Sequence, residues 1–319
     1  MHFIALLIGF FYGHVSVKGQ FCMNSGFSDV FRKKDMTKLK SFILAILIQM
    51  LVLPFIFTLL FHGDSTRHFV GNLGLPPLFF AGSAIGGFLF GVFMHYTGGC
   101  GAGIFFKIGE KNTGAGIAVA GFVGGIYLME MGWFSGLRVW VQQWNFNQQP
   151  FWQGNVAIPG VFSMVSGILM FLLLRKKDHK PNGASWGWKK TGIAVGFIGI
   201  LGWLSALYEG SSYGLSIMPG IMDALRFQAS WGLLFVIGIP LGAFWSSRKS
   251  KEKRFSLPKA DLMVRRFFGG MGLGVSGSVA AGCTVGHGLT FSPLLGAGSF
   301  VTILFIFLGS GLMGYITRK

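Results

Sequence analysis

The fold is decided by two related segments, GGFLFGVFMHYTGGCGAG at 86–103 and GGMGLGVSGSVAAGCTVG at 269–286. They align without gaps at a constant offset of 183, and seven of their positions are identical. One of these positions is a cysteine, of which the chain has only three, so chance does not explain the match. The chain therefore contains an internal repeat, and its two copies carry Cys100 and Cys283.

The composition surrounding this repeat is that of a membrane protein. Hydrophobic residues make up 52% of the 319 residues and charged residues only 12%, where soluble domains have about 25%. Such a chain is neither disordered nor an ordinary soluble enzyme, and it is predicted to be an all-α polytopic membrane protein. No phosphate-binding loop, dinucleotide fingerprint or Ser/His/Asp arrangement occurs in a fitting context, so we expect no cofactor and no enzymatic activity.

Apolar stretches along the chain predict about nine transmembrane helices. A bilayer core about 30 Å thick takes roughly 17 to 25 mostly apolar residues per helix. The first stretch also resembles the apolar part of a secretory signal, but no basic segment precedes it and no A-x-A site follows, so we expect it to be retained. The nine predicted spans are 3–17, 42–61, 78–96, 115–137, 156–174, 191–208, 229–246, 267–282 and 298–316.

The distribution of Lys and Arg predicts the orientation, because cytoplasmic loops collect these residues. With the N-terminus outside and the C-terminus in the cytoplasm, 23 of the 27 basic residues lie on the inner side. The outer segments hold only Arg67, Arg138 and Arg226, and Lys18 lies at the edge of the first span. The net charge of +17 is therefore a topology signal and not a nucleic-acid-binding surface.

This orientation inverts the repeat. The third predicted span runs inward and the eighth runs outward, so the two copies have opposite directions in the membrane. We expect one integral membrane transport domain, 1–319, with a first inverted half at 1–137 and a second at 191–319. Inverted repeats around glycine-broken helices are typical of secondary transporters, although channels share the plan.

Each copy of the repeat ends in Gly-Cys-x-x-Gly, which favours a glycine-rich re-entrant cysteine loop. Gly99, Gly101 and Gly282 leave the backbone free to turn and to direct several N–H groups at one anion. A half-helix starting near Ile104 or Leu289 would add its positive end. The thiols are soft and polarizable, which suits a sulfur-containing ligand better than an oxygen-only one. The alternative is that both cysteines are small buried packing residues.

Other ionisable residues near the motifs leave alternatives open. His287 either donates to an anion or is a packing histidine with satisfied nitrogens. Lys107 either helps to receive a dianion at the inner exit or pairs with Glu110 at the surface. Zinc ligation by the cysteines and nearby histidines is disfavoured because their spacings differ, so no metal is expected. Glu130 is either a proton-coupling site or an interfacial residue.

The third cysteine, Cys22, completes a resemblance to one family. Its context FCMNSGFSDVF (21–31), together with GGCGAGIFFKIGEKN (98–112) and AGCTVGHGLTFSPLLGAGS (281–299), resembles the YeeE/YedE sulphur-transport family of bacterial inner-membrane proteins. Members carry one cysteine after the first span and a glycine-flanked cysteine in each half. The likeness covers nearly the whole chain in span order, but 130–260 matches only in hydropathy. Gln20 departs from the basic residue expected there.

The resemblance implies a thiosulfate importer with an hourglass-like helical fold. Cys22, Cys100 and Cys283 would pass the substrate along by hydrogen bonds to its sulfur. It also implies a small TusA-like sulfur-carrier protein as partner on the cytoplasmic side, and leaves selenium compounds as an alternative cargo. We therefore expect uptake of thiosulfate or a similar small anion across the bacterial inner membrane. A membrane-embedded sulfurtransferase that forms a cysteine persulfide is the competing hypothesis from another class.

Overall fold

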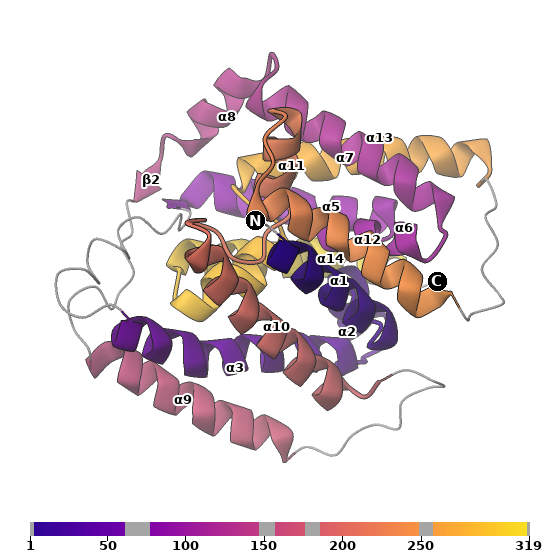
Figure 1. Cartoon of the computed structure of the whole chain (residues 1–319). Coiled ribbons are helices and arrows are strands. Elements are labelled where there is room, and N and C mark those ends of the chain that lie inside the picture. The colour runs from indigo at the N-terminus through magenta and orange to yellow at the C-terminus, as the bar shows by residue number, and fades with distance from the viewer. Residues whose placement is uncertain (1–2, 61–76, 147–156, 176–185, 249–257, 318–319) are drawn as a thin grey trace.

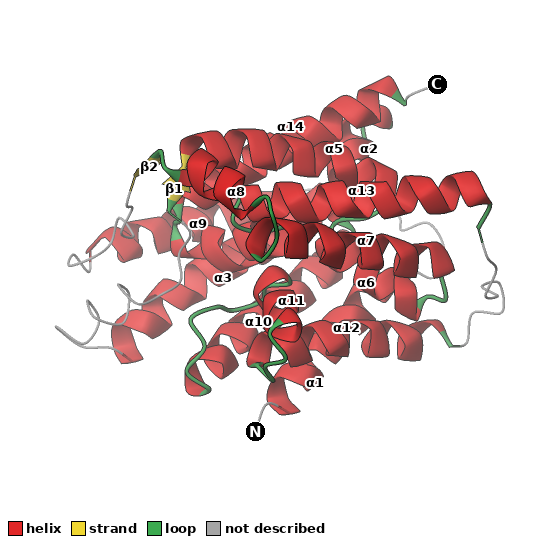
Figure 2. Ribbon diagram, turned by 90° about the horizontal axis from the view of Figure 1, so that it is seen from above, coloured by secondary structure: helices red, strands yellow, loops and turns green. Residues whose placement is uncertain are grey.

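The computed structural model describes residues 3–60, 77–146, 157–175, 186–248 and 258–317 (Figure 1). Most of these residues are helical, and the long helices run roughly parallel in a bundle (Figure 2). The described residues contain one small sheet, in which β1 (Leu78–Phe79) pairs antiparallel with β2 (Asn145–Phe146). The prediction of an all-α membrane protein is confirmed at this level.

The first part of the chain forms long apolar helices separated by short ones. The short helices α2 and α6 each begin directly after a cysteine, and α8 has no buried residue. The elements are α1 (Phe3–Lys18), α2 (Met23–Arg32), α3 (Thr37–Leu60), the π-helix η1 (Gly82–Gly86), α5 (Gly87–Thr97), α6 (Gly101–Gly109), α7 (Thr113–Glu130), α8 (Ser135–Gln142) and α9 (Ala157–Leu174).

The second part repeats this alternation of long and short elements. A short helix again follows the first long one, and irregular helical turns follow the cysteine loop. The elements are α10 (Trp188–Tyr208), α11 (Met218–Leu225), α12 (Trp231–Ser247), α13 (Ala260–Val279), the π-helix η2 (Gly286–Phe291), the 3₁₀ turn η3 (Ser292–Leu294) and α14 (Ala297–Ile316).

Helices coincide with the nine predicted spans, but not all of them are long and apolar enough to cross a bilayer. Within the described ranges, five stretches meet both criteria, namely 37–56, 82–109, 113–130, 188–208 and 297–316. Two shorter apolar helices cover 160–174 and 231–247. The number nine and the re-entrant loops therefore stay predictions. So does the orientation, since Arg67 and the basic residues at 176–180 and 249–254 lie outside the described residues.

Three predicted boundaries were wrong for local reasons. The fourth span was expected to reach residue 137, but α7 ends at Glu130 and a turn at Met131 and Gly132 leads into the separate helix α8. Helix starts were expected near Ile104 and Leu289. In the structure Cys100 is the N-cap of α6, which begins at Gly101, and η2 begins at Gly286. Of the glycines expected in the loops, Gly101 belongs to a helix, whereas Gly99 and Gly282 lie outside helices.

The long helices pack in four main pairs. Helix α1 lies against α12, α3 against α10, α5 against α14, and α7 against α13. In addition, α9 lies on α3 at the edge of the bundle (Figure 1). Each pair joins a helix from the first half of the chain to one from the second. The two halves are thus interleaved through these pairs.

Glycines bring α1 and α12 to backbone contact. A Cβ built on Gly9 or Gly13 would collide with the carbonyl oxygen of Phe235 or Ile239, and one built on Gly242 would collide with that of Phe10. In lipid, such close approach is what holds helices together, because apolar side chains gain nothing by leaving the lipid tails. The position of α1 in the bundle is therefore set by these glycines.

We expect Gly13→Ala to lower the free energy of unfolding by about 1–3 kcal/mol, because the added methyl group has only backbone to displace. Gly124→Ala on α7 is the matched control, since nothing lies within 4 Å of its Cβ position. Thermal unfolding in detergent measures both variants. If the Gly13→Ala and Gly124→Ala variants unfolded at the same temperature, α1 and α12 would not be in backbone contact.

Candidate functional site

The Cys100 loop interrupts an apolar stretch long enough to cross a bilayer. Helix α5 ends at Thr97, and Gly98 adopts the left-handed conformation at φ 73°. The Thr97 hydroxyl donates to the carbonyl of Gly99 at 2.7 Å. The Cys100 Sγ then accepts the backbone N–H of Gly103 at 3.3 Å, so the thiol itself caps α6.

Lys107, on α6, forms a hydrogen bond back to the start of this loop. Its ammonium group donates to the carbonyl of Gly98, one of the groups freed by the chain break. A Cβ on Gly99 would lie 3.1 Å from the carbonyl carbon of Gly103, so the loop is tightly folded on the start of α6. Lys107 therefore helps to satisfy the backbone of the Cys100 loop.

The Cys283 loop has a related shape. Helix α13 ends at Val279, and Ala281 is left-handed at φ 57°. Ala281 corresponds to Gly98 through the offset of 183, so both loops turn two residues before their cysteine. The Cys283 side chain is fully buried, and the chain continues through Thr284 into η2.

His287 holds the Cys283 loop together. Its Nε2 lies 2.9 Å from the carbonyl oxygen of Ala280, and its Nδ1 lies 3.0 Å from the hydroxyl of Ser299 on α14. A Cβ on Gly282 would lie 2.7 Å from Nε2, so the glycine makes room for the ring. Both ring nitrogens thus have hydrogen-bond partners within the protein. Of the two alternatives for His287, this arrangement fits a packing histidine with satisfied nitrogens.

Cys22 is the third cysteine of the site and lies directly before α2. It is the N-cap of α2 in extended conformation, and it is 7% exposed. Gln20 just before it is left-handed at φ 49°. The ammonium groups of Lys107 and Lys38 lie within electrostatic reach of the Cys22 thiol, and Lys38 also pairs with Asp29 at 3.0 Å.

The first turn of α6 brings the three cysteines together. A Cβ on Gly103 would lie 3.3 Å from Cys100 Sγ and 3.5 Å from Cys22 Sγ, so those sulfurs are no farther apart than the sum of these distances. A Cβ on Gly101 would lie 3.8 Å from Cys283 Sγ. All three thiols are free and buried. Glycines at these two positions therefore leave α6 bare where the thiols meet.

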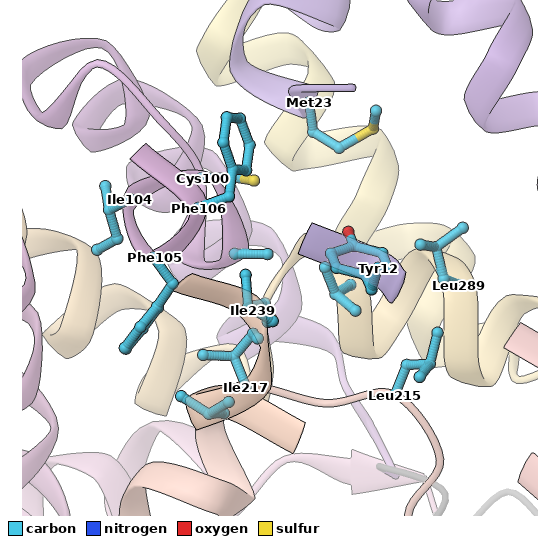
Figure 3. Close-up of a cluster of buried hydrophobic side chains, with 14 of the residues drawn as sticks. Tyr12, Met23, Cys100, Ile104, Phe105, Phe106, Leu215, Ile217, Ile239 and Leu289 are labelled. Carbon is cyan, nitrogen blue, oxygen red and sulfur yellow. The ribbon is translucent and has the colours of Figure 1, made fainter. Parts of the chain in front are cut away.

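Tyr12 is a further member of this cluster that the sequence reasoning missed. It belongs to the same buried core as the three cysteines and lies within electrostatic reach of each of them. Figure 3 shows its hydroxyl and the sulfur of Cys100 facing the same space from α1 and α6. No repeat or motif marks this residue. The only available signal is a phenol in a mostly apolar predicted span, which also contains His14 and Ser16.

A cavity of about 280 Å³ lies beside the Cys283 loop. Ser216 lines it and also faces the loop, since its Oγ would lie 3.1 Å from a Cβ on Gly286. Other lining residues are Glu209, Asp223 and Trp231. The cavity therefore approaches the thiol cluster from the side of α11.

Glu130 lies away from the thiol cluster. It is the last residue of α7, and its carboxylate pairs with Arg138 of α8 at 3.2 Å. The neighbouring Trp133 is almost fully exposed. This placement agrees with the interfacial alternative for Glu130.

The family model described as sulphur transport matches residues 18–312 of the chain. The chain belongs to this family. The match includes all three cysteines and both cysteine loops, and it begins after most of α1.

Two relatives of this sulphur-transport protein extend over nearly its full length. The thiosulfate transporter TsuA of Spirochaeta thermophila is 27% identical over 335 residues, covering 99% of each chain. The thiosulfate transporter TsuA of Escherichia coli K12 is 26% identical over 329 residues, covering 95% of this chain and 91% of the relative. Membership in a transport family disfavours the sulfurtransferase hypothesis.

We expect His287→Ala to destabilise the protein, because it strands the buried carbonyl of Ala280 and the buried hydroxyl of Ser299. Each unsatisfied group costs about 1–3 kcal/mol. Ser299→Ala should cost less, since His287 keeps its bond to Ala280. Thermal unfolding in detergent gives both values. A His287→Ala protein that unfolds like the wild type but no longer binds anion would assign His287 to the ligand instead.

Proposed function

We propose that this protein carries thiosulfate, or a closely similar sulfur-containing anion, into the cytoplasm through a constriction formed by Cys283, Cys100 and Cys22. The observation that carries the proposal is the meeting of all three thiols at Gly101 and Gly103 on α6. Packing alone does not require three cysteines from separate parts of the chain to lie around one helical turn. The two TsuA relatives are thiosulfate transporters by name, which supports this cargo.

The two halves of the chain are proposed to be inverted copies of one unit, approximately 1–137 and 191–319. The packing pairs support this arrangement. The pair α1 with α12 is matched by α10 with α3, and the pair α5 with α14 is matched by α13 with α7. Each pair turns into its counterpart when the two halves are exchanged, as a twofold relation demands. Such a relation places both cysteine loops near the middle of the membrane.

The route follows from this arrangement. With the N-terminus outside and the C-terminus in the cytoplasm, the cavity beside Ser216 lies on the outer side of the Cys283 loop. The anion would pass from there to Cys283, then to Cys100 and Cys22. Lys107 and Lys38 lie at the inner end of this path, where a positive potential favours arrival of a dianion.

The chemistry of the constriction suits a substrate with sulfur at one end and oxygen at the other. Thiols are weak, polarizable donors that can contact the terminal sulfur and release it again. The N-terminus of α6 points at the same place and attracts the negative charge. Neutral donors bind the anion without the strong attraction that would trap it.

On the cytoplasmic side, we propose that the protein delivers its substrate to a TusA-like sulfur-carrier protein in the bacterial cell. The basic residues assigned to the inner side would attract an acidic or anionic partner. Selenium analogues of the substrate have the same shape and a softer terminal atom. They are therefore the competing cargo at the same site.

Cys100→Ala and Cys283→Ala are each expected to reduce uptake of radiolabelled thiosulfate into proteoliposomes to background, because each removes a donor at the constriction. Cys→Ser at the same positions should be milder, since the hydroxyl still donates. Ser41→Ala, which also removes one buried polar atom, is the control and should transport normally. Full uptake by the Cys100→Ala/Cys283→Ala double variant would rule out the proposal.

Mass spectrometry after exposure to thiosulfate separates passage from covalent sulfur transfer. We expect intact protein of unchanged mass, because the substrate is held only by hydrogen bonds. The Cys22→Ser variant is the control for this position, because an added mass that is lost in the variant must have been on Cys22. A persistent gain of one sulfur atom on any of the three cysteines would favour the sulfurtransferase.

A further inference from the structure

Tyr12 is the one phenol in the described thiol cluster. The residue is 2% exposed, and its side chain lies within electrostatic reach of Cys22, Cys100 and Cys283. In Figure 3 the hydroxyl lies on the side of the ring on which Cys100 and Met23 also lie. A strong neutral donor therefore stands where the proposed substrate passes.

The ring of Tyr12 is held in place from both sides. The centroid of Phe21 lies 6.5 Å away in an edge-on arrangement, and that of Phe235 lies 5.8 Å away. Phe235 belongs to α12, whose backbone is locked against α1 at Gly9 and Gly13. The phenol is thus fixed relative to the bundle before any ligand arrives, and preorganised donors cost little on binding.

The hydroxyl can serve a ligand in this position. The buried hydroxyl of Ser16, one turn further along α1, lies near it but has no hydrogen-bond partner among the described residues. The phenol proton is therefore not committed to Ser16 and is left for another acceptor. The neighbouring thiols are weak acceptors and do not compete strongly for that proton.

The substrate needs such a donor. A sulfur-containing oxyanion exposes a soft terminal sulfur and hard oxygens, and three thiols match only the sulfur. The buried hydroxyl of Thr284 lies near Cys100 and has no hydrogen-bond partner among the described residues, but an aliphatic hydroxyl is a weaker donor than a phenol. Besides the backbone N–H groups at the start of α6, a side-chain donor to the oxygens replaces hydrogen bonds of water that the buried anion loses.

We propose that Tyr12 is a substrate-binding residue, whose hydroxyl donates to an oxygen of the anion while the terminal sulfur lies against the thiols. This inference rests on the proposed function. It makes Tyr12 the group that recognises the oxygen end of the substrate, whereas the cysteines recognise the sulfur end. The ligand class is a small anion with a sulfur atom at one end and oxygen atoms at the other, such as thiosulfate.

The test is the concentration dependence of radiolabelled thiosulfate uptake by Tyr12→Phe in proteoliposomes. The ring and its packing remain, so we expect an unchanged unfolding temperature and a KM raised about tenfold or more, the usual effect of losing a hydrogen bond to a charged group. Tyr127→Phe is the matched control on α7, where the side chain is half exposed, and its KM should equal that of the wild type.

A second variant keeps the result decisive if Tyr12→Phe fails to fold. Replacing Tyr12 by 3-fluorotyrosine preserves the shape and makes the phenol a stronger donor, so KM should fall. A wild-type KM in Tyr12→Phe, or an unchanged or raised KM in the 3-fluorotyrosine variant, would overturn the role of Tyr12. Absence of thiosulfate uptake by the wild type would instead overturn the proposed function.

Discussion

The structure depends on satisfying the backbone wherever a helix breaks inside the bundle. In a bilayer no water is available to pair with free N–H and C=O groups, so broken helices are tolerated only where protein supplies partners. Thr97, Cys100 Sγ and Lys107 supply them at the first break. His287 supplies one at the second, to the carbonyl of Ala280. The two breaks are thus stabilised by different side chains, although their turns are related.

This requirement explains why glycine and cysteine occur together. At Gly98 the chain needs a left-handed residue, and at Gly101 and Gly103 a side chain would occupy the space beside the sulfurs. Cys100 then has two roles, because its sulfur caps α6 and also faces the proposed route. A serine could cap the helix as well, but it would not provide a soft surface for a sulfur ligand.

How much of this could be read from the sequence depends on whether the signal was local. The apolar helices follow from residues that are adjacent in the chain, and the repeat, with its candidate residues Cys100 and Cys283, follows from two segments that match at a constant offset. The proximity of Cys22 to Cys100 came only through family resemblance, since no spacing rule joins positions so far apart. Tyr12 was missed for the same reason, because its contacts come from α2, α6 and α12. The break after Glu130 was missed because the apolar residues continue through Trp133 and Phe134.

The placement of charge around the site bears on how an anion could both enter and leave. Lys107 is committed to the carbonyl of Gly98, and Lys38 to Asp29, so neither ammonium group is a bare charge. The polar groups that meet at the bare turn of α6 are thiols, and the Tyr12 phenol lies within electrostatic reach of them. A pair of free cations there would bind a dianion so firmly that release would limit transport, whereas conduction needs binding that is favourable at entry and weak enough to allow exit. Weak donors at the narrow point, and beyond it a Lys38 whose charge is offset by Asp29, meet both conditions. On this argument, the scarcity of charge among the thiols is what allows the proposed substrate to pass.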